Sequence, residues 1–130
     1  MLVVDASVLV VALADDGADG DRARQRLRGE ELAAPELVDL EVTSVLRKEL
    51  AMGSLDARRA QLSLADLAEL AIARASHLPL LARCWELREN MTIYDAAYVA
   101  LAEVLEVSLL TADTRMARAP GPTCNIEVLH

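Results

Sequence analysis

Phenylalanine is absent from this chain of 130 residues, and its only aromatic residues are one tryptophan and two tyrosines. A core of packed aromatic rings is therefore excluded, and a core of leucine, valine and alanine is expected. Apolar residues still make up 54% of the sequence, which excludes a disordered chain. We expect a single domain over residues 1–130, because a chain of this length can bury one continuous core.

Cysteine and histidine are scarce as well, with two of each. Cys84 and Cys124 lie far apart in the sequence and do not have the spacing of metal ligands. His77 and His130 are not spaced as zinc ligands either. We therefore expect two ordinary buried thiols, with a disulfide as the alternative, and no zinc site.

Long hydrophobic runs and excess positive charge are also missing. The fullest early apolar run, residues 8–14, is too short to cross a bilayer, and no basic residue precedes it as in a secretion signal. The formal net charge is −8, which excludes a general nucleic-acid coat but not an enzyme that meets a phosphate chain through a metal ion. We expect a cytoplasmic protein without a membrane partner, and any tight protein partner is expected to be positively charged.

Hydrophobic periodicity predicts strands that alternate with helices. Strands are expected at residues 1–4, 31–35, 107–111 and 125–129, and helices at 7–16, 19–29, 36–53, 55–73, 80–90, 93–106 and, as a short turn, 114–119. This alternation is typical of a three-layer α/β domain with a mostly parallel sheet. The helix at 36–53 is apolar on most sides, so we expect it to be packed on both. Trp85 is expected to be a core or interface anchor.

Acidic residues stand where the predicted elements begin and end. Asp5 directly follows the first strand, and Asp113 follows the strand at 107–111. Asp95 lies in the first turn of a helix, and Glu41 lies on the helix after the second strand. Because sites in parallel sheets form outside the carboxyl ends of the strands, we expect these acids to share one edge. Lys48, on the helical stripe of Glu41, is the alternative partner for that buried carboxylate.

The aspartates also have a structural interpretation as helix caps. Thr92 and Asp95 fit a capping box at the start of the central helix. Asp113 can cap the short helical turn that follows it, and Asp5 or Ser7 can cap the first helix. Each aspartate taken alone is compatible with a cap, so it is their shared position at one sheet edge that favours a site.

Carboxylates that converge without a cation are costly. Two charges about 4 Å apart repel by roughly 4 kcal/mol at an effective dielectric near 20. Such a cluster must take up protons or bind a divalent ion, and all-oxygen ligation favours Mg²⁺ or Mn²⁺ over Zn²⁺. Acids that hold such ions and a water nucleophile are the arrangement used for phosphodiester hydrolysis. Three hydroxyls are then expected to orient the carboxylates or the water: Ser7, Ser44 and Thr111.

Four stretches together resemble the PIN-domain family, and within it the VapC toxins of toxin–antitoxin operons. They are VVDASVLV, ELVDLEVTSVLRK, WELRENMTIYDAAYVALAE and LLTADTRMARA, and they follow the family's order and spacing along nearly the whole chain. The resemblance implies a PIN-like three-layer α/β/α fold and a Mg²⁺- or Mn²⁺-dependent endoribonuclease. By motif position it implies a catalytic site of Asp5, Glu41, Asp95 and Asp113. The leading hypothesis has Asp5, Asp95 and Asp113 bind metal, while Glu41 either ligates metal or holds the attacking water.

The resemblance also implies partners: an RNA substrate, a second copy of the chain in a homodimer, and a VapB-type antitoxin. Such antitoxins lay a C-terminal segment along the groove, often with an arginine in the acidic site. Lys48 and Arg115 are candidate contacts to RNA phosphate, or else surface or ion-pair residues. Some PIN domains have a further acid after the Asp113 position, whereas Thr114, Arg115 and Met116 follow here. A second metal ion is therefore expected to be held weakly, or only once RNA supplies phosphate oxygens.

Two hypotheses of other classes remain open at this point. A PIN-like binding module that has lost catalysis would need no metal, although all four acids of the site are present. An aspartyl-phosphate enzyme would use Asp5 as nucleophile, but such sites commonly have a second aspartate two residues on, where this chain has Ser7.

Overall fold

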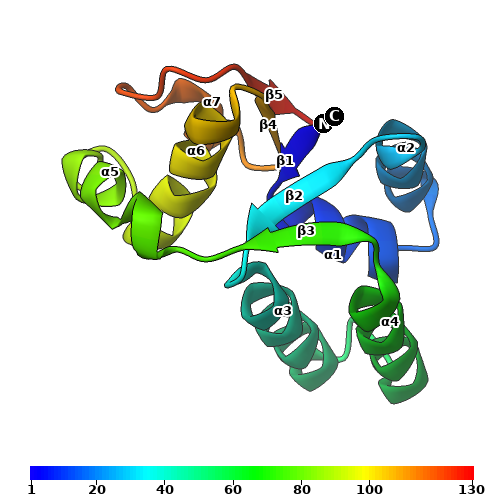
Figure 1. The fold of residues 1–130 in the computed structure, drawn as a ribbon. Helices are drawn as coiled ribbons and strands as arrows, with labels where there is room; N and C mark the ends of the chain where they lie inside the picture. Colours follow the sequence, from blue (N-terminus) through cyan, green and yellow to red (C-terminus); the bar gives the residue numbers. More distant parts are fainter.

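Five short strands form one parallel sheet in a computed structural model that describes residues 1–130 (Figure 1). The strands lie in the order β3-β2-β1-β4-β5, and every neighbouring pair is parallel. Their bounds are β1 Leu2–Val4, β2 Leu32–Pro35, β3 Ile72–Ala75, β4 Ser108–Thr111 and β5 Ile126–Val128. The central strands β1 and β2 are buried at every residue, as expected for apolar strands covered on both faces.

Seven α-helices and one short 3₁₀ turn cover the sheet in two layers. One layer holds α1 to α4, which contact one another, and the other holds α5 to α7, with α6 packed across β1, β2 and β4 (Figure 1). The predicted three-layer α/β/α fold is therefore confirmed. The bounds are α1 Ala6–Ala14, α2 Ala18–Leu27, α3 Val38–Met52, α4 Ala57–Glu69, η1 Leu78–Leu80, α5 Leu81–Glu86, α6 Ile93–Leu105 and α7 Thr114–Arg118.

The strand order places a topological switch point between β1 and β4. The chain runs outward from β1 through β2 to β3, then crosses to β4 and continues outward to β5. The helices after β1 and after β4 consequently lie on opposite faces of the sheet (Figure 1). In open parallel sheets, ligands bind in the crevice at such a point, outside the carboxyl ends of the two strands.

The core contains leucine, valine and alanine, as the composition predicts. Tyr98, in the middle of α6, is the only buried aromatic residue. Both cysteines are free thiols, Cys84 buried and Cys124 partly buried. No helix combines the length and the apolar character that a membrane crossing requires.

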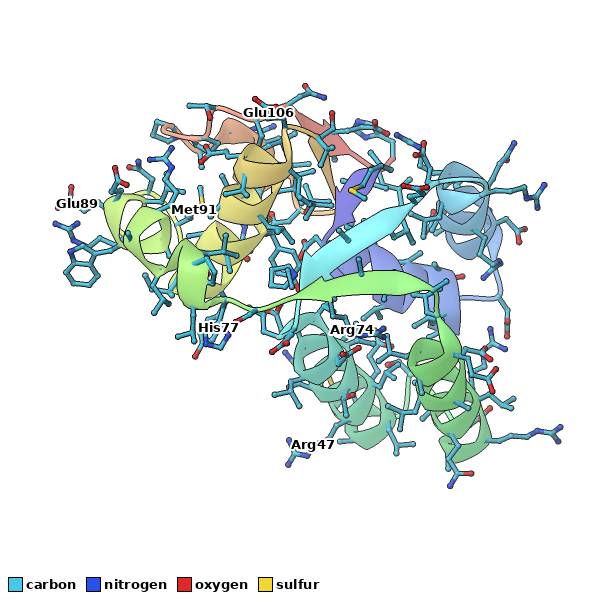
Figure 2. The ribbon with its side chains drawn as sticks, viewed as in Figure 1. Arg47, Arg74, His77, Glu89, Met91 and Glu106 are labelled. Carbon is cyan, nitrogen blue, oxygen red and sulfur yellow. The ribbon has the colours of Figure 1, made fainter.

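The structure corrects the helix predicted at residues 55–73. Helix α4 ends at Glu69, and Ile72–Ala75 form the edge strand β3. Isolated, this segment is rich in helix-forming residues, but it pairs with β2 along its whole length. Arg74 fixes the turn: its guanidinium lies on the side of β3 toward α3 (Figure 2), with Nε 2.7 Å from Asp39 Oδ2 and Nη2 3.0 Å from the carbonyl oxygen of Leu67.

One expectation about packing is also wrong, and a second holds only in its alternative form. Helix α3 is packed on one side only, through Val38, Val42 and Leu46, whereas Leu40 is 76% exposed. Of the two roles expected of Trp85, the core is excluded, because the residue is 63% exposed and Arg88 stacks over its ring, 4.5 Å from the centroid; the interface role stays a prediction. An apolar helical face shows that a side can be buried, but not that the fold supplies a neighbour for it.

Candidate active site

Asp5 connects the two strands of the switch point. Its backbone N–H donates to the carbonyl oxygen of Leu110 at 2.9 Å, which continues the β1–β4 pairing. Its buried side chain accepts two hydrogen bonds at Oδ2, from Ser7 Oγ at 2.7 Å and from Thr111 Oγ1 at 2.8 Å. Asp5 is the N-cap residue of α1, yet its carboxylate makes no cap hydrogen bond. The expected helix-cap role is therefore absent, and the carboxylate is held by hydroxyls at the switch point.

The same two hydroxyls also fix the backbone that leads to Asp113. Ser7 Oγ accepts from the N–H of Ala112 at 3.0 Å, and Thr111 Oγ1 accepts from the N–H of Asp113 at 3.0 Å. Each hydroxyl thus bonds the Asp5 carboxylate and the loop after β4 together. The structure brings Ser7 and Thr111 to the positions from which they can orient these acids, whereas Ser44 lies exposed on α3.

Asp113 is paired with the arginine two residues further on. Its Oδ1 caps α7 by accepting from the backbone N–H of Arg115 at 2.9 Å. The Arg115 guanidinium bonds the same carboxylate through both oxygens, Nε to Oδ1 at 3.2 Å and Nη2 to Oδ2 at 3.1 Å. These hydrogen bonds and the positive charge hold the pKa of Asp113 below its usual value.

Asp95 lies in the first turn of α6, where the backbone is capped as the sequence predicts. Its N–H donates to Thr92 Oγ1 at 3.1 Å. Burial raises the pKa of the Asp95 carboxyl, and the negative charges of Asp5 and Asp113 raise it further, against smaller opposing effects of Thr92 and Arg115. The carboxylate therefore lies within the electrostatic reach of both strand-end aspartates.

Glu41 projects from α3 toward α6, where the hydroxyl of Tyr98 donates to its Oε1 at 2.5 Å. Burial is the main cause that raises the pKa of Glu41, and the charges of Asp5 and Asp95 add to it, while the Tyr98 hydrogen bond acts in the opposite direction. Lys48, the alternative partner, is exposed and forms no ion pair with Glu41. The partner is a phenol from another helix, so the carboxylate keeps its negative charge uncompensated.

The four acids therefore form one electrostatic unit that contains a single paired cation. The charges of Asp5 and Asp95 act on Glu41, and the charges of Asp5 and Asp113 act on Asp95. Arg115 is the only basic residue bonded to any of the four acids. No three acidic, histidine or cysteine side chains lie close enough together to hold a metal ion as they stand. The donor set nevertheless fits a divalent cation, because it is made of oxygen atoms only and its charge is largely uncompensated.

A hollow of about 230 Å³ opens beside these acids, between the start of α6 and α7. Asp95 and Asp113 line it from the two helices, and Asn90, Thr92 and Arg115 supply its other polar groups. Larger hollows exist elsewhere, but the largest is lined by α1, α2 and α4, away from the switch point. We place the candidate site at the smaller hollow, because Asp95, whose pKa is raised, and Asp113, whose pKa is lowered, both line it.

Tyr98 is the functional residue that the sequence reasoning missed. A signal was present: Tyr98 follows Asp95 by three residues, so both lie on one face of α6. Tyr98 is also flanked by apolar residues on both sides, Ala96–Ala97 and Val99–Ala100, where a buried hydroxyl needs a hydrogen-bond partner. Which residue accepts that bond depends on where the start of α3 lies relative to α6, and the sequence does not contain that distance.

Comparison with known proteins agrees with this architecture. The family model described as PIN domain matches residues 2–122. Ribonuclease VapC9 of Mycobacterium tuberculosis is 42% identical over 99% of this chain and 98% of its own length, and ribonuclease VapC1 of the same organism is 42% identical over 98% and 97%. Among solved structures, PAE2754 of Pyrobaculum aerophilum is 26% identical, with a TM-score of 0.73 over 98% of this chain and 83% of that one. VapBC2 of Rickettsia felis, solved bound to a promoter DNA fragment, shares the fold with a TM-score of 0.71 at 15% identity, over 99% and 98% of the two chains.

Proposed function

Because this chain belongs to the PIN-domain family, with VapC ribonucleases as full-length relatives, we propose that it is an endoribonuclease that hydrolyses RNA phosphodiester bonds. One observation carries the proposal. Asp5 and Asp113 follow the two neighbouring strands at the switch point of a parallel sheet, where Glu41 and Asp95 add further negative charge that Arg115 offsets only in part. A strand-end cluster of this kind suits a cation-dependent reaction on an anionic substrate.

The proposed cofactor is Mg²⁺ or Mn²⁺, held by Asp5, Asp95 and Asp113. When bound, such an ion lowers the pKa of a water molecule and offsets the charge that develops on the phosphate oxygens. The chain's own residues do the positioning: Ser7 and Thr111 fix the orientation of Asp5, and Thr111 also fixes the backbone at Asp113.

Glu41 is proposed to ligate the ion or to hold the attacking water and accept its proton. A carboxylate whose pKa is raised is a stronger base than an exposed one, which favours the second role. Tyr98 acts as a positioning residue, because its 2.5 Å hydrogen bond fixes one oxygen of Glu41 and leaves the other oxygen free of protein partners. Lys48 and Arg115 are the candidate contacts to RNA phosphate, and only Arg115 lines the hollow at the acids.

The substitution Asp5→Asn tests this function. Asparagine keeps the shape of the side chain and can still accept from Ser7 or Thr111, but it removes the charge. We expect RNA cleavage in Mg²⁺ or Mn²⁺ to fall by about 10²-fold or more, which is the effect of removing one electrostatic group from a catalytic site. Growth inhibition on expression should be lost with it.

The matched control is Asp66→Asn, which removes the same charge from an exposed position on α4. It should cleave RNA at the wild-type rate. Circular dichroism and thermal unfolding show whether Asp5→Asn remains folded. A folded Asp5→Asn protein that cleaves RNA as fast as the control would contradict the proposed mechanism.

We also propose that the chain is the toxin of a toxin–antitoxin pair and is bound by a VapB-type antitoxin. The net charge of −8 suits a partner with basic residues at the contact. Structures that share this fold include one described as a toxin–antitoxin complex from Klebsiella pneumoniae. Co-expression with the product of the adjacent small reading frame should suppress RNA cleavage, and lack of any suppression would argue against this partner.

A homodimer is proposed on the basis of apolar side chains that the single chain leaves exposed. Leu40 on α3, Leu78 before α5 and Trp85 on α5 are 76%, 69% and 63% exposed. Burying these side chains against a second copy of the chain would remove their apolar surface from water. Light scattering should give twice the monomer mass of 14.1 kDa, and a monomer at micromolar concentration would refute the proposal.

The catalytically inactive binding module is not favoured. All four acids are present, and the neighbouring negative charges raise the pKa values of Glu41 and Asp95, which is unfavourable at neutral pH unless a cation binds. Calorimetry without Mn²⁺ binding at millimolar concentration would revive that alternative.

A further inference from the structure

Arg115 bonds a proposed metal ligand, although its own side chain is almost fully in solvent. The guanidinium contacts both oxygens of Asp113 while the side chain is 89% exposed. Asp113 is only 26% exposed and faces the hollow beside Asp95. The side chain thus extends from α7 through solvent back to Asp113, the N-cap residue of the same helix.

The Arg115 guanidinium is the only positively charged group that pairs with any of the four acids. Its charge is felt at Asp95 as well as at Asp113. Arg118, three residues on in α7, is exposed and forms no ion pair. An exposed pair such as Arg115–Asp113 is weak and reversible, because water and salt screen it. A cation of higher charge that binds the same oxygens can therefore displace the guanidinium.

We propose that Arg115 is the internal counter-ion of this site: its guanidinium neutralises Asp113 in the metal-free chain and is displaced when a divalent cation binds. The inference rests on the proposed function, because it takes Asp113 as a metal ligand. The backbone N–H of Arg115 still caps α7 through Oδ1 after the exchange, so the helix need not move. The released guanidinium then stands beside the hollow, where it can bind an RNA phosphate through paired N–H donors.

The test compares Arg115→Gln with Arg118→Gln. Both variants remove one positive charge from α7, so the overall charge of the chain is matched, and both keep the backbone cap. Mn²⁺ affinity is measured without RNA, by the loss of the free-ion signal in electron paramagnetic resonance. Arg115→Gln should bind Mn²⁺ about two- to fivefold more tightly than Arg118→Gln, the range that corresponds to an exposed ion pair.

A second measurement follows the guanidinium directly in the wild-type protein. The Nε–H resonance of Arg115 should shift as diamagnetic Mg²⁺ is added, with the same midpoint as the metal-binding isotherm. Equal Mn²⁺ affinities of the two variants, or an Nε–H resonance that does not move at saturating Mg²⁺, overturn the exchange alone. Failure of the wild type to bind either ion overturns the exchange and the metal site together.

Discussion

Replacing Glu41 by glutamine should stabilise the metal-free protein at neutral pH. Glutamine keeps the volume of the side chain and still offers Oε1 to the Tyr98 hydroxyl at its 2.5 Å contact. It removes a negative charge that is half-buried and that Asp5 and Asp95 repel. Replacing this proposed functional residue should therefore raise the stability of the folded protein, whereas most core substitutions lower it.

The sign and size follow from the pKa of Glu41, which folding raises above the ordinary value of 4.5. Between the unfolded and the folded pKa, the folded chain binds more protons than the unfolded chain, so stability falls as pH rises. The stability that protonated Glu41 contributes to the folded state is thus fully present below about pH 4.5, and it is lost as pH rises through the folded pKa. Each pKa unit between the folded and the unfolded state corresponds to about 1.4 kcal/mol of unfolding free energy. One kcal/mol shifts the melting temperature by about 4 °C in a chain of this size.

The assay is thermal unfolding in a chelator at pH 7.5 and at pH 4. Glu41→Gln should melt above wild type at pH 7.5 and together with it at pH 4. Glu89→Gln is the control, because Glu89 points into solvent at the outer side of α5 (Figure 2). Adding Mn²⁺ at 100 times its dissociation constant should stabilise the wild type by about 2.7 kcal/mol and the variant by less. If Glu41→Gln is less stable than wild type at pH 7.5, the ionised carboxylate of Glu41 does not destabilise the folded protein.

Two further substitutions test the hydroxyls that hold the acids. Thr111→Val should cost about 1–3 kcal/mol of unfolding free energy in urea, because it leaves the N–H of Asp113 without its acceptor and removes a donor to buried Asp5; an unchanged midpoint would show that neither bond matters. Tyr98→Phe should raise the pKa of Glu41 further and destabilise the protein by about 1–3 kcal/mol, more at pH 7.5 than at pH 4, because the lost bond favours the charged carboxylate. An equal loss at the two pH values would refute that charge dependence.

Most of the fold could be predicted because the helices and central strands have strong local signals. The helix over 36–53 ends at Gly53, whose φ of 79° is left-handed, as its sequence position predicts. Strand β3 could not be predicted in the same way. Of its four residues only Ile72 favours a strand, and their conformation is set by pairing with β2 and by the contacts of Arg74 with α4 and Asp39.

Part of the candidate site could likewise be predicted from the sequence. Strand ends and helix starts are local features, so Asp5, Asp95 and Asp113 could be placed at one edge from the sequence. Contacts between helices are not local. The Glu41–Tyr98 bond stands in place of the expected Lys48 pair, because Glu41 in the first turn of α3 reaches the hydroxyl of Tyr98 on α6, whereas Lys48 is exposed.

Helix capping, the competing explanation for these acids, accounts for only part of the arrangement. It explains the Asp113 carboxylate, which accepts from the start of α7, and the backbone of Asp95, which Thr92 caps. It does not explain Asp5, which stands at the N-cap of α1 but turns its carboxylate to Ser7 and Thr111 instead. The positive end of α6 lowers the cost of the negative charge on Asp95, which burial and the charge of Asp5 increase. Because burial disfavours the charges of Glu41 and Asp95 beside Asp5 and Asp113, we propose that a cation offsets them, and this is the reason to propose one function for all four acids rather than four separate caps.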